Sequence, residues 1–547
     1  MTQLAQDQLD DTTADVGALG FEGVDVTTKP TLISDATLQK GINVYIDDQG
    51  LVLRRPAIKY QALVATAGET HWPVRASALY DVPGKDSLIV LRGGKVYDFN
   101  TVTLGYSAIP GATYTDTTAY RPQMAQLVTT IFRPTGISTG GLTWHTWNAG
   151  VWTTGTVTTW KLVGDGGMPV FGAVAAHKFR VFASPAGTDE LYSSDYLSAT
   201  LNTNWDKTVN GLRVGTGEGD PIVALISYQE TLLLVFKESS IWIVDTADAA
   251  PANWIVRKLT GEVGCTAPET VVQMGQDVVF MSRHGVVSIG ALALSNSVSP
   301  ATAISAPMRT ALLEGRAVWA GRWREFYLLG WDGSGAQADG AADKIFAYNT
   351  ETKRWVGEWS AAFPDAGLPG GGTAPSLGWV GCDLVRPNGL EQTVLTDGAG
   401  RVCVLDGALS TTTDSSGAGA EQNIPFEVVT KAWSFGQPLN WKNLHRMEVE
   451  FFRQDLNAID ITLVVDGAPP EPIEMNATTV SSGLVFPFML PATFSNTEVR
   501  RIARHIRPLI RRRVREVAVR ISGNGFGRLS LRGITVSAFI DSAPISA

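Results

Sequence analysis

The chain has 547 residues, which is enough for two to four domains. Hydrophobic residues make up 44% of it and charged residues only 18%, and this balance excludes a disordered or highly charged chain. The net charge of −9 excludes a surface that attracts nucleic acid as a whole, so any contact with DNA would need a local basic patch.

The composition also bears on the fold and the compartment. The 56 glycines, 16 tryptophans and abundant threonines favour short strands joined by glycine turns. Cys265, Cys382 and Cys403 can form no disulfide framework and match no zinc motif. The N-terminus lacks the apolar stretch of a secretory signal, and the longest apolar runs, such as 232–236, are strand-sized. We therefore expect a protein made in a cytoplasm, with no membrane-spanning segment and no cofactor.

The first 40 residues predict an N-terminal arm. They are polar, rich in threonine and without clear periodicity, apart from a short apolar break at 19–21. Two interpretations stay open: the arm is disordered, or it becomes ordered against a neighbouring subunit.

Between residues 41 and 410, strand-like segments recur with turn signals between them. Residues 78–82 and 87–91 flank a Pro-Gly turn, and a Gly-Gly pair leads into 95–100, which predicts three successive antiparallel strands. Similar units return about every 45–55 residues, a period typical of a β-propeller. We expect a divergent propeller of six or seven blades, the number staying open because residues 105–165 are irregular. A series of β-sandwiches is the alternative.

The C-terminal part has a different pattern. Residues 411–422 are small and polar, which predicts a linker, and residues 423–547 follow it. Apolar and charged residues alternate over 447–451, and apolar residues return at every second position over 517–521, so one face of each strand should be buried. A slip in this alternation at Gly533 predicts a bulge. The pattern predicts a C-terminal β-sandwich, and the whole chain is therefore expected to be all-β.

One helix is expected inside the sandwich. Polar capping residues at 495–497 precede apolar residues at helical spacing, and Pro508 should end the segment. The pattern predicts a short, arginine-rich helix near residues 497–507. The apolar positions are Val499, Ile502, Ile506 and Ile510.

This segment belongs to a basic cluster of nine arginines among residues 500–520. Arginine suits planar contacts with carboxylates or phosphates. Three interpretations stay open: a solvated face with intrachain ion pairs, a contact with an acidic surface of another subunit, or a contact with DNA phosphates. The residues proposed for a subunit or DNA contact are Arg500, Arg504, Arg507, Arg511, Arg512 and Arg513.

The sequence contains no specific catalytic motif, and we expect no enzyme. The glycine-rich run 215–220 precedes a predicted strand and is interpreted as a loop between blades. The sharpest alternative class is a carbohydrate-binding or glycan-processing propeller, but the Ser-Ser-Asp run at 193–195 does not match the Asp box of such enzymes. A cluster of tryptophans could form core, a partner contact or a sugar-stacking platform; it comprises Trp144, Trp147, Trp152 and Trp160.

Three stretches resemble a known family. GINVYIDDQGLVLRRPA at residues 41–57 resembles the N-x-Y-x-D-x-x-G-x-x-x-x-R-P-G stretch of tail hub proteins of short-tailed bacteriophages, with Ala57 in place of the last glycine. These include the packaged-DNA stabilisation and nozzle-type proteins. KFRVFA, YSSD and NW between residues 178 and 205 are similar to a second unit of this group. GCTAP at 264–268 and FMSRHGV at 280–286 are similar to a third.

The resemblance implies a structural protein of the virion tail. Such proteins form a ring, commonly a hexamer, below the portal and its adaptor, where they extend the DNA channel, help to retain packaged DNA and dock tail fibres or a spike. The implied partners are further copies of the chain, portal and adaptor proteins, fibre or spike proteins, and double-stranded DNA in weak contact. A ring of negative subunits would repel phosphates, so that DNA passes without sticking. No residue is implied to be catalytic.

Overall fold

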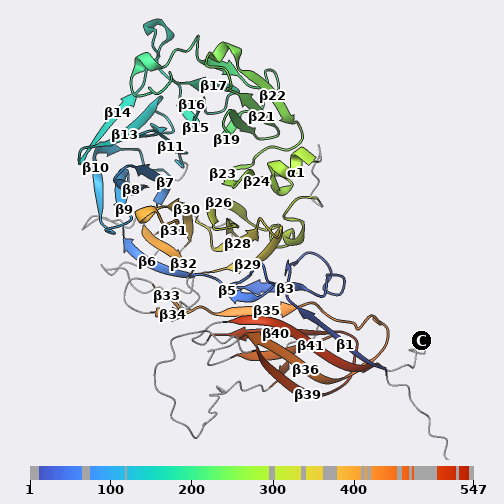
Figure 1. Ribbon diagram of the computed structural model, residues 1–547. Coiled ribbons are helices and arrows are strands. Elements are labelled where there is room, and N and C mark those ends of the chain that lie inside the picture. Colours follow the sequence, from blue (N-terminus) through green and yellow to red (C-terminus); the bar gives the residue numbers. More distant parts are fainter. Residues whose placement is uncertain are drawn as a thin grey trace, which may run out of the picture.

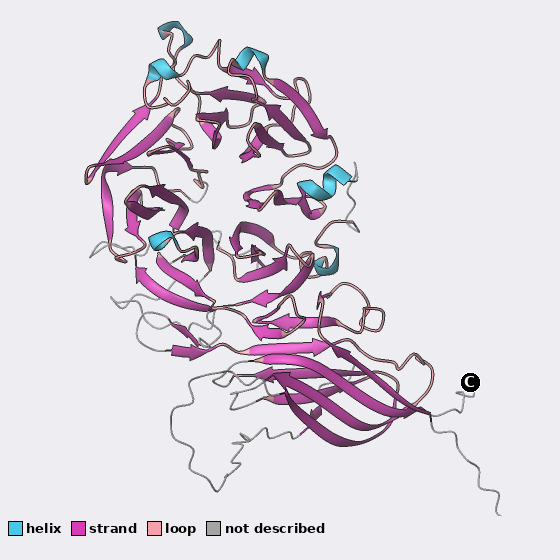
Figure 2. Cartoon of the chain, viewed as in Figure 1, coloured by secondary structure: helices cyan, strands magenta, loops and turns pink. Residues whose placement is uncertain are grey.

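The computed structural model describes residues 12–63, 74–117, 120–294, 302–333, 341–360, 378–398, 400–407, 413–415, 421–452, 459–466, 471–473, 502–524 and 529–540. These residues form strands almost throughout. A ring of small sheets lies at one end of the molecule and a two-layered domain at the other (Figures 1 and 2). The expected all-β class is confirmed.

The first four sheets of the ring are consecutive four-stranded antiparallel meanders, which we number as blades 1 to 4. The turns between their strands are short, as the glycine-rich turn signals predict. Blade 1 contains β7 (Val74–Val82), β8 (Lys85–Arg92), β9 (Lys95–Asn100) and β10 (Tyr106–Thr113); blade 2 contains β11 (Ala125–Leu127), β12 (Thr130–Pro134), β13 (Leu142–Asn148) and β14 (Val151–Val157); blade 3 contains β15 (Phe171–His177), β16 (Arg180–Pro185), β17 (Glu190–Ser193) and β18 (Gly211–Arg213); blade 4 contains β19 (Ile222–Tyr228), β20 (Leu232–Lys237), β21 (Ile241–Asp245) and β22 (Ile255–Thr260).

Three further sheets complete the ring. Blade 5 has three described strands, and a short helix, α1 (Ile289–Leu294), follows it. Blade 7 takes its outermost strand from the N-terminal part of the chain. Blade 5 contains β23 (Ala267–Met274), β24 (Asp277–Ser282) and β25 (Gly285–Ser288); blade 6 contains β26 (Arg316–Trp323), β27 (Phe326–Asp332), β28 (Lys344–Asn349) and β29 (Arg354–Trp359); blade 7 contains β30 (Trp379–Val385), β31 (Gln392–Asp397), β32 (Arg401–Asp406) and β6 (Ala57–Leu63).

The seven sheets close into a propeller. The innermost strand β30 of blade 7 packs against β7 of blade 1, so the last blade meets the first. Apolar side chains fill the spaces between blades, as Phe132, Trp160 and Tyr192 do between blades 2 and 3. The described residues therefore form a seven-bladed β-propeller, which confirms the predicted architecture, and the irregular residues 105–165 contribute β10 and all of blade 2.

The C-terminal domain is a β-sandwich, as predicted. Its first sheet contains β39 (Ile502–Val514), β36 (Lys442–Phe452), β41 (Ser530–Ile540), β1 (Thr12–Leu19), β5 (Val52–Arg54) and β4 (Val44–Ile46). Its second sheet contains β2 (Gly23–Val24), β3 (Thr37–Ile42), β35 (Phe426–Thr430), β40 (Val517–Gly523), β37 (Asp460–Val465) and β38 (Glu471–Ile473). Met447, Val449 and Phe451 belong to the same buried apolar cluster as Val519 and Ile521, which is the core that the alternation predicts. The β36–β41 pairing changes register between Gly533 and Leu531, where a bulge is expected.

The two domains share a sheet. The last strand of blade 6, β29, bridges to β3 of the sandwich through Glu358 and Ile42, so one continuous sheet runs from the propeller into the second layer of the sandwich. One buried apolar cluster likewise contains residues of blade 6 and of both sandwich layers. The domains therefore form one rigid body and not two units on a flexible tether.

The boundaries differ from those expected. Residues 12–19 of the expected arm form β1 and pair with β41 of the same chain, while residues 1–11 lie outside the described residues. Residues 44–54 belong to the sandwich, and the propeller begins at β6. The expected linker 411–422 contains β33 (Thr413–Ser415), which pairs with β6 and with β34 (Glu421–Asn423). The physical reason is that β1, β5 and β33 each pair with a strand hundreds of residues away, which local sequence patterns do not reveal.

The helix expected near residues 497–507 is wrong for the part that the structure describes. Residues 502–507 lie in strand β39, which pairs with β36 over its whole length, and residues 497–501 lie outside the described residues. Pro508 sits within β39 opposite Arg446. Proline is tolerated there because β39 is the terminal strand of its sheet among the described residues.

Candidate functional site: a buried joint between propeller and sandwich

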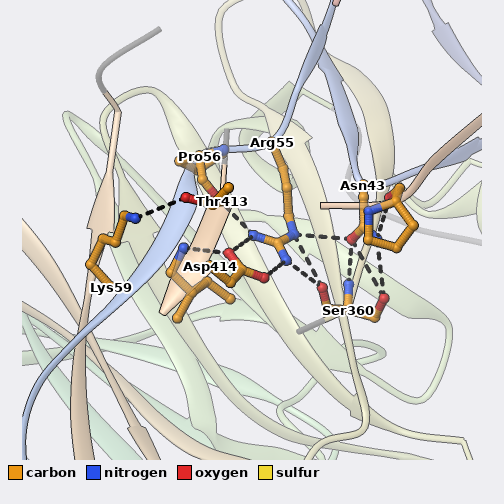
Figure 3. Close-up of polar contacts among 9 residues, drawn as sticks. Asn43, Arg55, Pro56, Lys59, Ser360, Thr413 and Asp414 are labelled. Atoms are coloured by element: carbon orange, nitrogen blue, oxygen red, sulfur yellow. Dashed lines mark hydrogen bonds and ion pairs between the residues drawn. The ribbon is translucent and has the colours of Figure 1, made fainter. Parts of the chain in front are cut away.

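The first motif of the sequence builds a polar cluster where the two domains meet (Figure 3). Arg55 lies between β5 of the sandwich and β6 of the propeller, and Asn43 lies between β3 and β4. Ser360 follows blade 6, and Asp414 lies in β33. We call these four residues the junction cluster. They come from three segments that are far apart in the sequence, so their contacts tie together the N-terminal hairpin, the propeller and the chain that leads into the sandwich.

The centre of the junction cluster is a fully buried ion pair. Arg55 donates two hydrogen bonds to the Asp414 carboxylate, from Nη1 to Oδ1 at 2.9 Å and from Nη2 to Oδ2 at 2.5 Å, and both side chains are 0% exposed. Arg55 also donates to the carbonyl oxygens of Ser360 and Pro56. The Ile58 backbone N–H donates to Asp414 at 2.8 Å. Every charged atom is thus paired, which a buried charge requires.

Asn43 holds the other side of the guanidinium group. Its Oδ1 accepts hydrogen bonds from Arg55 Nε at 3.0 Å and from the Ser360 backbone N–H at 2.8 Å, and its Nδ2 donates to the Pro425 carbonyl at 2.9 Å. Its backbone has φ of 53°, in the left-handed region that asparagine tolerates better than most residues. Asparagine is therefore favoured at this position by both its backbone and its side chain.

The junction cluster is suited to holding chain segments together. The carboxylate of Asp414 is shielded from solvent and is already engaged by Arg55 and Ile58. A nucleophile or general base needs access to a substrate, and this geometry provides none. The sequence motif contained Asn43 and Arg55 but gave no sign of Asp414 or Ser360. Asp414 lies in a Thr/Ser/Gly-rich stretch that resembles a linker.

A second polar site is the central cavity of the propeller, which has a volume of about 540 Å³. The innermost strands of all seven blades border it. Its charged lining residues are two arginines and two carboxylates, so the lining has no excess of either sign: Arg75, Arg121, Glu269 and Asp383. Arg75 Nε pairs with Asp116 at 2.6 Å, and Ser77 donates a hydrogen bond to Asp383. Sequence reasoning missed all four, because they lie on three different blades and in the segment before β11.

Burial raises the pKa of Asp383 to about 6, although the hydrogen bond from Ser77 lowers it. The ordinary value in an unfolded chain is about 3.9, so the folded state binds this proton more tightly. The resulting stabilisation is present below about pH 4 and is lost as pH rises through about 6. The variant Asp383→Asn should therefore gain about 2–3 kcal/mol relative to wild type between pH 4 and pH 7.5. Urea unfolding at both pH values measures this, with the exposed Asp48→Asn as control; a pH-independent difference would contradict it.

The third motif joins blade 4 to blade 5. The Cys265 backbone N–H donates to the Lys237 carbonyl at 2.8 Å, and burial raises the pKa of the Cys265 thiol to about 12. Gly264 lies so close to blade 4 that an added Cβ would be 2.4 Å from the carbonyl oxygens of Lys237 and Glu238. The glycine and the cysteine of GCTAP are thus packing residues.

We expect Gly264→Ala to lower the free energy of unfolding by about 1–3 kcal/mol, because the new methyl group overlaps backbone atoms that cannot rotate away. Chemical unfolding measures the loss. Gly164→Ala is the matched control, since no atom lies within 4 Å of its added Cβ. Equal stability of the two variants would contradict this prediction, because it would mean that blades 4 and 5 move apart with no loss in the free energy of unfolding.

The structure describes the side chains of only a few residues of the arginine cluster. Arg515 stacks on Trp441 at 4.7 Å, and Arg520 pairs with Glu427 at 2.7 Å, so these two have intrachain partners. Arg513 is exposed at the end of β39. Arg504, Arg507, Arg511 and Arg512 occupy positions along the backbone of β39, and Arg500 and Arg501 lie outside the described residues.

Two other candidates are mainly structural. Trp152 and Trp160 are buried, and Trp144 donates from its indole nitrogen to the Thr200 carbonyl at 3.1 Å, so the tryptophan cluster chiefly forms core. In the glycine-rich run 215–220, Asp220 accepts hydrogen bonds from the backbone N–H groups of Glu238 and Ser239, both at 3.0 Å. This confirms a loop between blades 3 and 4.

Two kinds of feature are absent from the described part of the chain. No three His, Cys, Asp or Glu side chains gather there closely enough to hold a metal ion. In the same part of the chain, no helix has the length and apolar character needed to cross a membrane.

Comparisons with known proteins give the following. No family model matches the chain, and no curated protein matches it. Among solved structures, the chain is similar to one from the crystal structure of the mitotic checkpoint complex, with 10% identity, a TM-score of 0.34, and 63% of this chain and 98% of that chain covered. It is also similar to YCF48 from Cyanidioschyzon merolae (10% identity, TM-score 0.34, 64% and 98%) and to Kluyveromyces lactis Hsv2 (10%, 0.32, 66% and 93%).

Proposed function

We propose that the chain is a structural protein of a bacteriophage tail, which assembles as a ring below the portal and adaptor, extends the DNA channel and docks fibres or a spike. The observation that carries this proposal is the junction cluster. Asn43 and Arg55 belong to the first of the three stretches on which the resemblance to tail hub proteins rests, and their contacts join a propeller and a sandwich. A rigid subunit of this kind suits an assembly that must resist the pressure of packaged DNA.

In this proposal the DNA passes between copies of the chain. The central cavity of the propeller, with a volume of about 540 Å³, cannot serve as a channel for a duplex. The major groove alone is about 12 Å wide, and a channel would have to be wider than that over the whole depth of the propeller. The net charge of −9 per copy gives the ring a negative field, which disfavours tight binding of phosphates. We therefore expect weak binding of double-stranded DNA at about 0.15 M salt. Fluorescence anisotropy with labelled duplex measures this, and tight binding would contradict the channel model.

The decisive experiment is to locate the chain in virus particles. Particles washed in high salt should contain it in a fixed, multiple copy number by quantitative mass spectrometry, and immunogold labelling should mark the tail. Particles assembled without it should lose tail density and release DNA. Absence from washed particles, or normal DNA retention without the chain, would overturn the proposal. A glycan array is the control for the carbohydrate-binding alternative, and specific binding or turnover there would favour that class.

A further inference from the structure

The central cavity of the propeller is lined by two carboxyl groups with oxygen atoms that the blades leave without donors. Glu269 lies in β23 of blade 5 and Asp383 in β30 of blade 7, and both line the cavity of about 540 Å³. Among the described residues, the Glu269 carboxylate has no ion-pair partner. Ser77 donates a hydrogen bond to Oδ2 of Asp383, while Oδ1 receives none from the described residues.

The arginines of the lining do not neutralise these two carboxylates. Arg75 is already paired with Asp116, from Nε to Oδ1 at 2.6 Å. Arg121 donates from Nη1 to a backbone carbonyl of blade 6 at 3.5 Å, and its charge acts on Glu269 from beyond ion-pair distance. Burial raises the pKa of Glu269 and the pKa of Asp383, which shows that both negative charges lack solvation. A cation in the cavity would supply what these charges lack.

The wall between the two carboxyl groups is apolar. Blade 6 lies between blades 5 and 7, and its innermost strand β26 packs against both β23 and β30 (Figure 1). Its described lining side chains are Val318, Trp319 and Ala320, none of which is charged. The indole N–H of Trp319 donates to the Trp379 carbonyl at 2.7 Å, so this polar group is already engaged. The cavity thus presents an acid, an apolar strip and a second acid on three successive blades.

We propose that the central cavity binds a small aliphatic diamine, with one ammonium group at Glu269, the other at Asp383, and the methylene chain along Val318 and Ala320. The cavity has the size of a small-molecule pocket, for which about 300–1,000 Å³ is usual. An ammonium group has three donors and no acceptor, which suits carboxylate oxygens without donors. Methylene groups gain free energy when they leave water for an apolar wall.

Two other kinds of cation fit this arrangement less well. A monoamine would leave one of the two carboxylates without a counter-charge. A magnesium ion keeps several of its water molecules and would gain nothing from the apolar strip of blade 6. Binding of a diamine requires no second copy of the chain, so the site goes beyond the proposed function and does not depend on it.

Calorimetric titration of the full-length chain tests this site. Putrescine and cadaverine are the diamines, butylamine is the matched monoamine, butanediol is the matched neutral compound, and magnesium chloride supplies a metal ion. One diamine should bind per chain, butylamine should bind about 10-fold more weakly or worse, and butanediol should not bind. The proposal is overturned if neither diamine binds, if butylamine binds as tightly as putrescine, or if Mg²⁺ binds as tightly as the better diamine.

The variants Glu269→Gln and Asp383→Asn test the two contacts separately. Each replaces a carboxylate by an amide of nearly the same shape, and each should weaken diamine binding by about 10- to 100-fold. Urea unfolding shows whether each variant is folded. The control variant Glu230→Gln with Asp248→Asn changes two exposed acids of blade 4 outside the cavity lining and should bind as wild type does. Unchanged affinity in either cavity variant, or an equal loss in the control, would overturn the site and leave the tail proposal standing.

Discussion

Replacing Arg55 with alanine is expected to lower the free energy of unfolding by about 3–5 kcal/mol, because the variant leaves the Asp414 carboxylate buried without a counter-charge. The Ser360 carbonyl and the Asn43 Oδ1 atom lose a donor in the same step. The damage should be concentrated at the junction of the domains. Calorimetry should show two separated transitions where wild type shows one, since the propeller and the sandwich would no longer unfold together.

The double variant Arg55→Met with Asp414→Leu tests whether charge is the cause. Removing both partners of a buried ion pair is often much less costly than removing one, so the double variant should recover part of the loss. Recovery should be incomplete, because Arg55 also donates to Ser360 and Pro56. If Arg55→Ala were as stable as wild type and unfolded in a single transition, the junction cluster would have no role in coupling the domains.

The second large effect is expected for Trp205→Ala, with a loss of about 3–5 kcal/mol. Trp205 is 0% exposed, lies in the core between blades 2 and 3, and donates from its indole nitrogen to the Ala199 carbonyl at 3.0 Å. The substitution leaves a large cavity and a carbonyl without its donor. Urea unfolding followed by tryptophan fluorescence measures the effect. Leu201→Ala, in the same loop but with Leu201 60% exposed, should change stability little, and similar losses in both variants would contradict the argument.

The propeller could be predicted from sequence because most of its strands pair with the next strand along the chain, and the sandwich because buried and exposed residues alternate along its strands. The failure at β39 has a clear physical cause. Ile502, Ile506 and Ile510 are four residues apart, a spacing that places them on one face of a helix and, because four is even, also on one face of a strand. Pairing with β36 decides between the two. Pro508 was the available signal, since proline is unfavourable inside a helix but tolerated in an edge strand.

The candidate site could be predicted only in part, because its partners are distant in sequence. Arg55 and Asp414 are 359 residues apart, and Asn43 and Ser360 are 317 apart. The motif around Asn43 and Arg55 could be found since those residues lie within one hairpin. Asp414 follows three threonines in a polar stretch, and nothing in that local pattern distinguishes a buried acid from a solvated one.

The pairing of β6 with β32, and of β1 with β41, has a consequence for biosynthesis. The propeller ring cannot close until the ribosome has passed residue 406, and β1 has no partner until residues 533–540 emerge. A nascent chain must therefore keep its first strands unpaired throughout most of translation, which exposes it to aggregation and favours chaperone binding. A chain that ends before residue 401 would lack the partners of both β6 and β1, so both strands would stay unpaired and open to proteolysis.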